Sequence, residues 1–242
     1  MPKPDIYLSI IVPAYNEAER IPKTLRRFHE YFANQPFNYE ILVVNDGSKD
    51  RTAEVVGAMA SEIKNLRFID RKKNMGKGYA VREGMLEAYG KIRLFADADN
   101  ATDISHFEKM RPMFDHGSDV VICSRDAKDA AGAKQAVSQS LWKRALGNLG
   151  NLYIQFLAVP GIWDTQCGFK AFRDHAAEAI FKAAKVNRWA FDVEALALAR
   201  KFNYKIGIVP ADWINDSRTT VSFLSYFKTL WEVFKIYLSL RK

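Results

Sequence analysis

The first 125 residues alternate short, almost entirely apolar runs with longer segments of helical periodicity. The apolar runs span residues 7–12, 40–44, 66–69, 92–96 and 120–122. Between them, segments such as 17–33 and 51–63 repeat apolar residues every three or four positions, which is typical of amphipathic helices. Strands that are apolar along their whole length are buried on both faces. The pattern therefore predicts an α/β fold with a mostly parallel central sheet and helices on both faces.

The pattern changes after residue 125. A stretch rich in alanine, glycine and lysine at 126–136 predicts a loop, and helical periodicity returns at 138–159, 189–202 and 222–240. One further apolar run at 206–209 predicts a last strand. A chain of 242 residues has enough length for one large domain with a substantial core.

Charge and cysteine content limit the class of protein. Lysine and arginine outnumber aspartate and glutamate by 36 to 28, and the excess of +8 lies within 125–151 and 200–242. A basic second half suggests an anionic partner, such as a phosphorylated substrate, an anionic membrane surface or nucleic acid. The two cysteines have neither metal-site spacing nor a disulfide framework. No signal peptide or membrane-spanning run is evident, so we expect neither a secreted nor an integral membrane protein.

Polar side chains follow three of the predicted strands. Glu17 comes after the first strand, Asp46 after the second, and Asp97 and Asp99 after the fourth. In a parallel sheet these carboxyl ends meet at one edge, where ligands bind. Two carboxylates two residues apart repel each other unless a cation lies between them, and Mg²⁺ or Mn²⁺ prefers such oxygen ligands. The turn after the first strand has no glycine, which excludes the dinucleotide-binding fingerprint.

Four motifs together resemble the family 2 glycosyltransferases, which have the GT-A nucleotide-diphospho-sugar transferase fold. The motifs are VPAYNE at 12–17, VNDGS at 44–48, NMGKG at 74–78 and DAD at 97–99. Two later segments, DTQCGFK at 164–170 and RWAFDVE at 188–194, resemble the dolichyl-phosphate β-glucosyltransferase subgroup. The resemblance spans nearly the whole chain, and we expect no counterpart here of the membrane anchor that precedes the domain in eukaryotic members.

The resemblance implies one domain over 1–242, with a nucleotide-sugar-binding half at 1–125 and an acceptor-binding half at 126–221. It also implies roles for residues of the first half. Asp97 and Asp99 would hold a divalent cation, Mg²⁺ or Mn²⁺, and the donor diphosphate, with Asp99 the stronger candidate ligand. Asp46 would accept a hydrogen bond from the base. The remaining residues expected around the nucleoside are Pro13, Ala14, Tyr15, Glu17, Gly76 and Lys77.

For the second half, the resemblance implies contacts with phosphates and with the sugar. Arg125, Arg144 and Arg218 would neutralise the phosphates of donor and acceptor. The other residues expected to contact substrate are Asn148, Asp164, Asp192 and Glu194. The implied reaction is inverting transfer of glucose from UDP-glucose to dolichyl or another polyprenyl phosphate. Because a phosphate monoester is already anionic near neutral pH, a strong general base is dispensable in that reaction.

Alternative functions remain open at this level. A mannosyltransferase that uses GDP-mannose would have the same fold, and transfer to a saccharide hydroxyl would need a base such as Asp192 or Glu194. Asp192 and Glu194 also fit a structural role, as acidic residues that complement a helix N-terminus. A catalytically silent basic module is disfavoured by the intact Asp97 and Asp99, and nucleic acid as a partner would leave the acidic cluster unexplained.

The amphipathic segment 222–242 predicts contact with a membrane. One face of its helix carries Phe223, Phe227, Leu230, Trp231, Phe234 and Leu238. Such a face either packs on the core or lies in the headgroup region of a bilayer. A polyprenyl acceptor keeps its tail in the bilayer, so we expect a cytoplasmic protein that is peripheral on the cytoplasmic face of a membrane.

Overall fold

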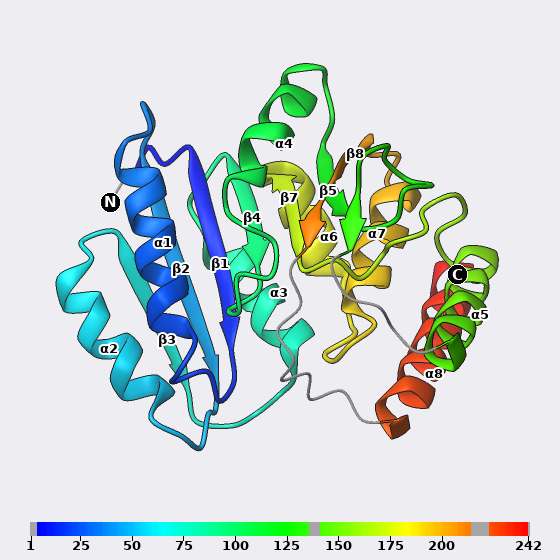
Figure 1. The fold of residues 1–242 in the computed structure, drawn as a ribbon, viewed down its shortest axis with the longest axis horizontal. Helices are drawn as coiled ribbons and strands as arrows, with labels where there is room; N and C mark the ends of the chain where they lie inside the picture. The colour runs from blue at the N-terminus through cyan, green and yellow to red at the C-terminus, as the bar shows by residue number, and fades with distance from the viewer. Residues whose placement is uncertain (1–3, 136–140, 214–222, 242) are drawn as a thin grey trace.

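The computed structural model describes residues 4–135, 141–213 and 223–241 (Figure 1). The strands are β1 (Leu8–Ala14), β2 (Tyr39–Asp46), β3 (Leu66–Arg71), β4 (Ile92–Ala96), β5 (Val120–Ser124), β6 (Lys134–Gln135), β7 (Phe169–Arg173), β8 (Ile206–Pro210) and β9 (Asp212–Trp213). The helices are α1 (Ile21–Ala33), α2 (Thr52–Glu62), α3 (Lys77–Glu87), α4 (His106–Asp115), α5 (Leu141–Leu157), α6 (Asp174–Ala183), α7 (Phe191–Lys201) and α8 (Phe223–Leu240).

A seven-stranded sheet forms the centre of the molecule, in the order β3-β2-β1-β4-β7-β5-β8. β7 is antiparallel to both of its neighbours, and the other pairings of this sheet are parallel. The short strands β6 and β9 form a separate parallel pair. The predicted α/β fold with a mostly parallel sheet is therefore confirmed.

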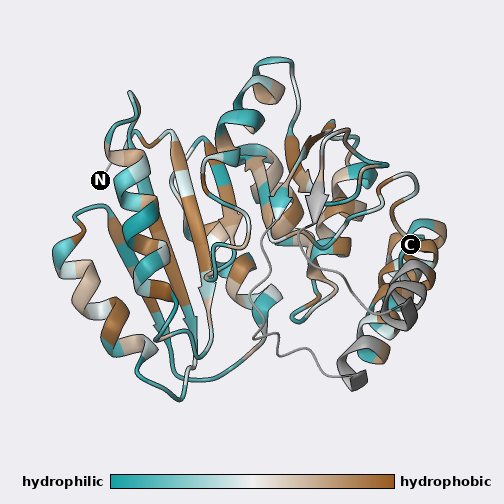
Figure 2. Ribbon diagram, viewed as in Figure 1, coloured by the Kyte–Doolittle hydropathy of each residue, from teal (hydrophilic) through white to brown (hydrophobic). Residues whose placement is uncertain are grey.

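Apolar layers cover both faces of the sheet. Along β1, Ile10 and Val12 join the layer that contains side chains of α1, α2 and α4. Ile11, which lies between them in sequence, joins the opposite layer with side chains of α3, α6 and α7. Figure 2 shows the central strands as the most hydrophobic part of the ribbon. Burial on both faces explains why these strands are continuously apolar rather than alternating.

The described second half contains four elements that the periodicity did not predict: β6, β7, α6 and β9. β7 was overlooked because its sequence, Phe-Lys-Ala-Phe-Arg, carries two basic residues in five. The stretch 126–136, predicted as a loop, contains β6 at the end of its described part. Its Asp129 carboxylate accepts hydrogen bonds from the backbone N–H groups of Trp163 and Asp164, at 2.7 Å each. These bonds fix the stretch to the segment before β7.

α8 packs against α5 and α7 at one end of the molecule (Figure 1). Val233 and Ile236 of α8 are buried in the core, whereas Phe227 and Trp231 remain 54% and 58% exposed. α8 is thus neither wholly a core helix nor wholly free of the core. Among the described helices, none has the length and apolarity needed to span a bilayer.

Candidate active site

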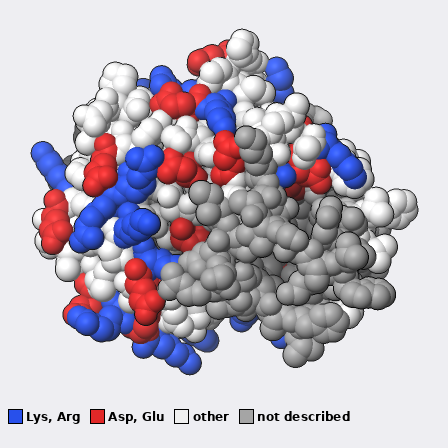
Figure 3. Space-filling model, viewed as in Figure 1, with Lys and Arg blue, Asp and Glu red and all other residues white. Residues whose placement is uncertain are grey.

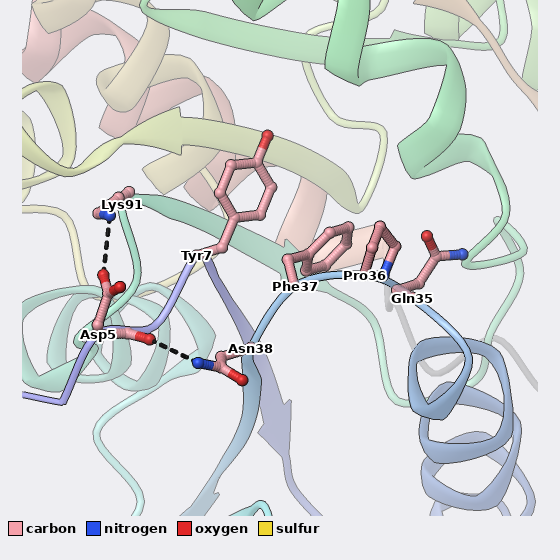
Figure 4. Close-up of a pocket in the computed structure, with 7 residues that line it drawn as sticks. All are labelled: Asp5, Tyr7, Gln35, Pro36, Phe37, Asn38 and Lys91. Atoms are coloured by element: carbon pink, nitrogen blue, oxygen red, sulfur yellow. Dashed lines mark hydrogen bonds and ion pairs between the residues drawn. The ribbon is translucent and has the colours of Figure 1, made fainter.

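The carboxyl ends of β1, β2 and β4 lie at one edge of the sheet, as their register requires. A hollow of about 350 Å³ lies at the opposite edge, between residues that precede β1, β2 and β4; Figure 4 shows the residues that line it. Its lining, which includes Asp5, Tyr7 and Lys91, contains none of the residues predicted for substrate or metal. On the face seen in Figure 3, acidic and basic side chains are interspersed over the described surface.

Glu17, Asp97 and Asp99 form an acidic cluster at the carboxyl edge. Burial raises the pKa of Asp99, and the negative charge of Asp97 raises it further. Burial also raises the pKa of Glu17, although Arg20 donates to its carboxylate at 2.7 Å. Arg20 also approaches Asp99, with 4.0 Å between nitrogen and oxygen. The cluster therefore concentrates negative charge that one neighbouring arginine only partly offsets.

Lys77 brings a second cation to this cluster. Its Nζ lies 2.5 Å from Oδ1 of Asp97. Burial opposes the charged amine, but the carboxylates of Asp97 and Asp192 outweigh that effect, so the pKa of Lys77 is raised. Lys77 was predicted to lie near the base. In the structure its ammonium group contacts the carboxylate of Asp97, which was predicted to bind metal.

Asp192 is buried at the start of α7 and accepts a hydrogen bond from Lys170 at 2.6 Å. Lys170 lies in β7, is fully buried, and also donates to the carbonyl oxygen of Cys167. Burial raises the pKa of Asp192, while Lys170 and Lys77 oppose the rise. Asp192 is thus part of the same charged network as Asp97, and Lys170 orients it. Sequence reasoning did not predict Lys170 as a site residue. Its position between apolar residues of β7 is the signal that could have indicated a buried, paired lysine.

Gly168 allows β7 to approach the acidic cluster. The backbone N–H of Asp97 donates to the carbonyl oxygen of Gly168 at 3.2 Å. A Cβ atom at Gly168 would lie 1.9 Å from Oδ2 of Asp97 and 2.4 Å from its Cγ. The absence of a side chain at Gly168 is therefore what leaves room for the Asp97 carboxylate.

Asp46 and Gly76 take part in packing the loop before α3. The Asp46 carboxylate accepts hydrogen bonds from the backbone N–H groups of Met75 and Gly76, at 2.8 and 2.7 Å. Gly76 has φ of +105°, and a Cβ there would lie 2.4 Å from the carbonyl oxygen of Asn187. This glycine therefore makes room for the turn before α7. Base contacts by Asp46 and Gly76 stay predictions.

Arg125 and Asp164 are paired with each other. Nε and Nη2 of Arg125 donate to the two oxygens of Asp164, at 2.7 and 2.8 Å. Burial opposes the charge on both groups, but each partner stabilises the other, so the pKa of Arg125 is raised and that of Asp164 is lowered. The guanidinium also lies over the ring of Trp213. Asp164 thus orients Arg125, a role that sequence reasoning did not assign to it.

The other predicted residues are not all brought into the network. Glu194 accepts hydrogen bonds from the backbone N–H groups of Lys185 and Val186, which favours its structural interpretation. Pro13 and Ala14 are buried at the end of β1, and Tyr15 beyond them is 41% exposed. Arg144 and Asn148 belong to α5, and Arg218 lies outside the described residues.

Comparisons with known proteins show which family the chain belongs to. The family model described as glycosyl transferase family 2 matches residues 9–181. The chain belongs to glycosyltransferase family 2. It is 39% identical to a dolichyl-phosphate beta-glucosyltransferase from Trichomonas vaginalis, over 91% of this chain and 70% of the relative. A dolichyl-phosphate beta-glucosyltransferase from Homo sapiens is 36% identical, over 93% of this chain and 73% of the relative.

Solved structures show the same fold at low sequence identity. Glucosyl-3-phosphoglycerate synthase from Mycobacterium tuberculosis, in complex with Mn²⁺, UDP and phosphoglyceric acid, superposes with a TM-score of 0.69. The match covers 97% of this chain and 78% of that one, at 16% identity. A mannosyltransferase from Pyrobaculum calidifontis, in complex with GDP-Man and Mn²⁺, gives a TM-score of 0.60 over 98% and 74% of the two chains, also at 16% identity. This glycosyltransferase therefore has the predicted GT-A fold.

Proposed function

We propose that this glycosyltransferase transfers glucose from UDP-glucose to dolichyl or another polyprenyl phosphate, with inversion at the anomeric carbon. The observation that carries the proposal is the Asp97–Asp99 pair at the carboxyl edge of the sheet, in a chain whose curated relatives bear that activity in their names. Residues 1–125 serve as the nucleotide-sugar half, and 126–221 as the acceptor half. Transfer from GDP-mannose, or transfer to a saccharide hydroxyl, would replace this proposal.

The residues at the acidic cluster fit a hard divalent cation. Among the described residues, no group of three or more histidine, cysteine, aspartate or glutamate side chains is arranged as a metal site. Mg²⁺ and Mn²⁺ nevertheless bind through one or two carboxylates when substrate phosphates and water supply the other ligands. Asp97 and Asp99 would hold such an ion, whose chemistry is neutralisation of the leaving diphosphate. We propose that the enzyme is metal-dependent in this way.

The protein groups around the cluster have separable roles in the proposal. Glu17 and the end of β1, with Pro13, Ala14 and Tyr15, face the nucleoside. Asp192, held by Lys170, contacts hydroxyl groups of the sugar. Since the acceptor oxygen already carries negative charge, Asp192 need not remove a proton. Alignment and charge neutralisation then account for catalysis.

The phosphate-binding side of the proposal rests on arginines. Arg125 keeps a fixed orientation because it donates to both oxygens of Asp164. The same carboxylate stabilises the charged form of the guanidinium. We propose that Arg125, together with Arg144, Asn148 and Arg218, binds the acceptor and donor phosphates. Asp164 then acts through Arg125.

A membrane surface completes the proposal. Six large apolar side chains of α5 and α8 are exposed: Leu149, Leu152, Phe156, Phe227, Trp231 and Leu238. The two helices contact each other, so these side chains belong to one end of the molecule. Exposed apolar clusters of this kind mark interaction surfaces. We propose that this end docks peripherally on the cytoplasmic face of a membrane, where the acceptor lipid resides.

Transfer of labelled sugar into an organic phase tests the reaction directly. We expect label from UDP-glucose to enter the lipid fraction only when a polyprenyl phosphate and Mg²⁺ or Mn²⁺ are present, and to be lost with EDTA. GDP-mannose and a soluble saccharide acceptor are tested in parallel. Label from GDP-mannose alone would overturn the choice of donor, and label on the saccharide alone would overturn the choice of acceptor.

Replacement of Asp99 tests the metal site. Asp99→Ala should weaken Mn²⁺-dependent binding of UDP by about tenfold or more, because the variant lacks one of the two carboxylates available to the ion. Calorimetry with UDP, with and without Mn²⁺, measures the effect. Asp115→Ala removes an exposed carboxylate from the end of α4 and serves as the control. Equal UDP binding by both variants would contradict the assignment.

Flotation with liposomes tests the membrane surface. The double variant Phe156→Ser/Trp231→Ser should bind vesicles about tenfold or more less tightly, because two exposed rings no longer enter the interface. Tyr15→Ser removes an exposed ring from the end of β1 and should leave flotation unchanged. A double variant that floats like the unaltered protein would show that α5 and α8 do not dock.

A further inference from the structure

Trp189 is an exposed aromatic residue beside the acidic cluster rather than on α5 or α8. It lies in the turn before α7, and 37% of its surface is exposed. The Lys77 ammonium lies 6.0 Å from the centroid of the indole ring and, at the same time, 2.5 Å from Asp97. The ring therefore borders the charged network at the point where Asp97, Lys77 and Asp192 meet.

The turn that carries Trp189 is held firmly from several sides. The carbonyl oxygen of Asn187 accepts from the N–H of Tyr79 at 3.0 Å, and its side-chain oxygen accepts from Arg82 at 2.9 Å. The N–H of Ala190 donates to Glu232 of α8 at 3.1 Å. Because the backbone of this turn is already fixed, the partly exposed ring can bind a ligand with little loss of backbone conformational entropy.

The surroundings of the ring match the chemistry of a hexose. A pyranose has C–H groups on its faces and hydroxyl groups around its rim. An indole face carries partial negative charge and attracts such C–H groups, while nearby charged groups bind hydroxyls. Lys77 supplies such a charge next to Trp189, and the Asp192 carboxylate, which interacts with Lys77, supplies another in the same network. A phosphate would not use the ring, whereas a nucleobase also stacks on an indole, so binding of the free nucleotide has to be compared with binding of the nucleotide sugar.

We propose that Trp189 is the platform on which the transferred hexose of the nucleotide-sugar donor stacks. This inference rests on the proposed function and deepens it, because it names the residue that recognises the sugar rather than the nucleotide. The sugar is then fixed between the ring and the Asp192–Lys170 pair.

Comparison of a nucleotide with its sugar conjugate isolates this role. In the presence of Mn²⁺, Trp189→Leu should weaken binding of UDP-glucose by roughly tenfold and change binding of UDP by less than about twofold. Trp189→Phe should recover part of the loss, because it retains an aromatic face. Phe202→Leu, which replaces a similarly exposed aromatic residue just after α7, is the matched control and should change neither affinity.

The titrations also include GDP and GDP-mannose, so that the two proposals fail separately. Binding of GDP-mannose in place of UDP-glucose would overturn the proposed donor. The effect of Trp189→Leu on the affinity for GDP-mannose, relative to its effect on the affinity for GDP, would still decide the role of Trp189. Equal losses for nucleotide and conjugate in Trp189→Leu, or no loss for either, would overturn the stacking role. Failure of the unaltered enzyme to bind any of the four would overturn both proposals.

Discussion

Gly168→Ala should lower kcat/KM of the transferase by about 10²-fold, because the new methyl group and the Asp97 carboxylate need the same space. The added Cβ would lie 1.9 Å from Oδ2 of Asp97, so the carboxylate must rotate or β7 must move away from β4. Rotation displaces the Asp97 carboxylate from Lys77 and from the proposed metal position, and a shift of β7 displaces Lys170, which holds Asp192. Steady-state kinetics and calorimetric binding of UDP with Mn²⁺ measure the effect.

A second glycine provides a matched control for this variant. Gly57 lies inside α2, and a Cβ there would meet nothing within 4 Å. Gly57→Ala should therefore keep full activity and stabilise the fold by about 0.5–1 kcal/mol, since alanine loses less backbone entropy in a helix. Circular dichroism shows whether Gly168→Ala remains folded. A folded Gly168→Ala enzyme with normal kinetics and metal-dependent UDP affinity would contradict the steric role of Gly168.

Lys170→Met should lower the free energy of unfolding by about 3–5 kcal/mol, because it leaves the Asp192 carboxylate buried without its partner. The side chains of Lys170 and Asp192 are only 1% and 6% exposed. In the variant, the pKa of Asp192 rises further above its unfolded value. The deficit should thus be largest near pH 7 and shrink toward pH 4, where Asp192 can take up a proton. Urea denaturation at several pH values measures it.

Two further variants test the interpretation of Lys170. Lys182→Met breaks an ion pair with Glu178 on the surface of α6, where the side chains are 69% and 30% exposed, and should cost no more than about 0.5 kcal/mol. The double variant Lys170→Met/Asp192→Leu removes both buried charges and should regain most of the lost stability. A large deficit that persists in the double variant, or one independent of pH, would show that Lys170 acts through packing rather than through charge.

The periodicity of the chain was sufficient to predict the first half of the fold. Strand β4 was predicted with its observed bounds, and the other early strands differ from their predicted ends by a few residues. β7 was missed because an antiparallel strand inserted between β4 and β5 depends on contacts far along the chain. Lys170 also interrupts the apolar pattern by which buried strands are recognised, and its charge is tolerated because Asp192 and the carbonyl oxygen of Cys167 accept hydrogen bonds from it.

The candidate site was predictable only in part. The spacing of Asp97 and Asp99 and their position after a strand indicated an acidic cluster, and the structure places them together with Glu17. Gly76 was expected near the nucleoside, but a Cβ there would meet the carbonyl oxygen of Asn187, in the turn before α7. The positions of glycines in a sequence do not distinguish a backbone that approaches a substrate from one that packs closely against another part of the chain.

The α/β class of this glycosyltransferase, and the edge of the sheet that carries its carboxylates, could be predicted from the order of its residues. Apolar periodicity is a local property, and parallel strands necessarily bring their carboxyl ends to one side. The pairing of its charges is visible only in the folded chain. Arg125 meets Asp164 across 39 residues, and Lys170 meets Asp192 across 22. Pairing of buried charges depends on distances of a few ångströms between elements, and chain spacing does not encode those distances.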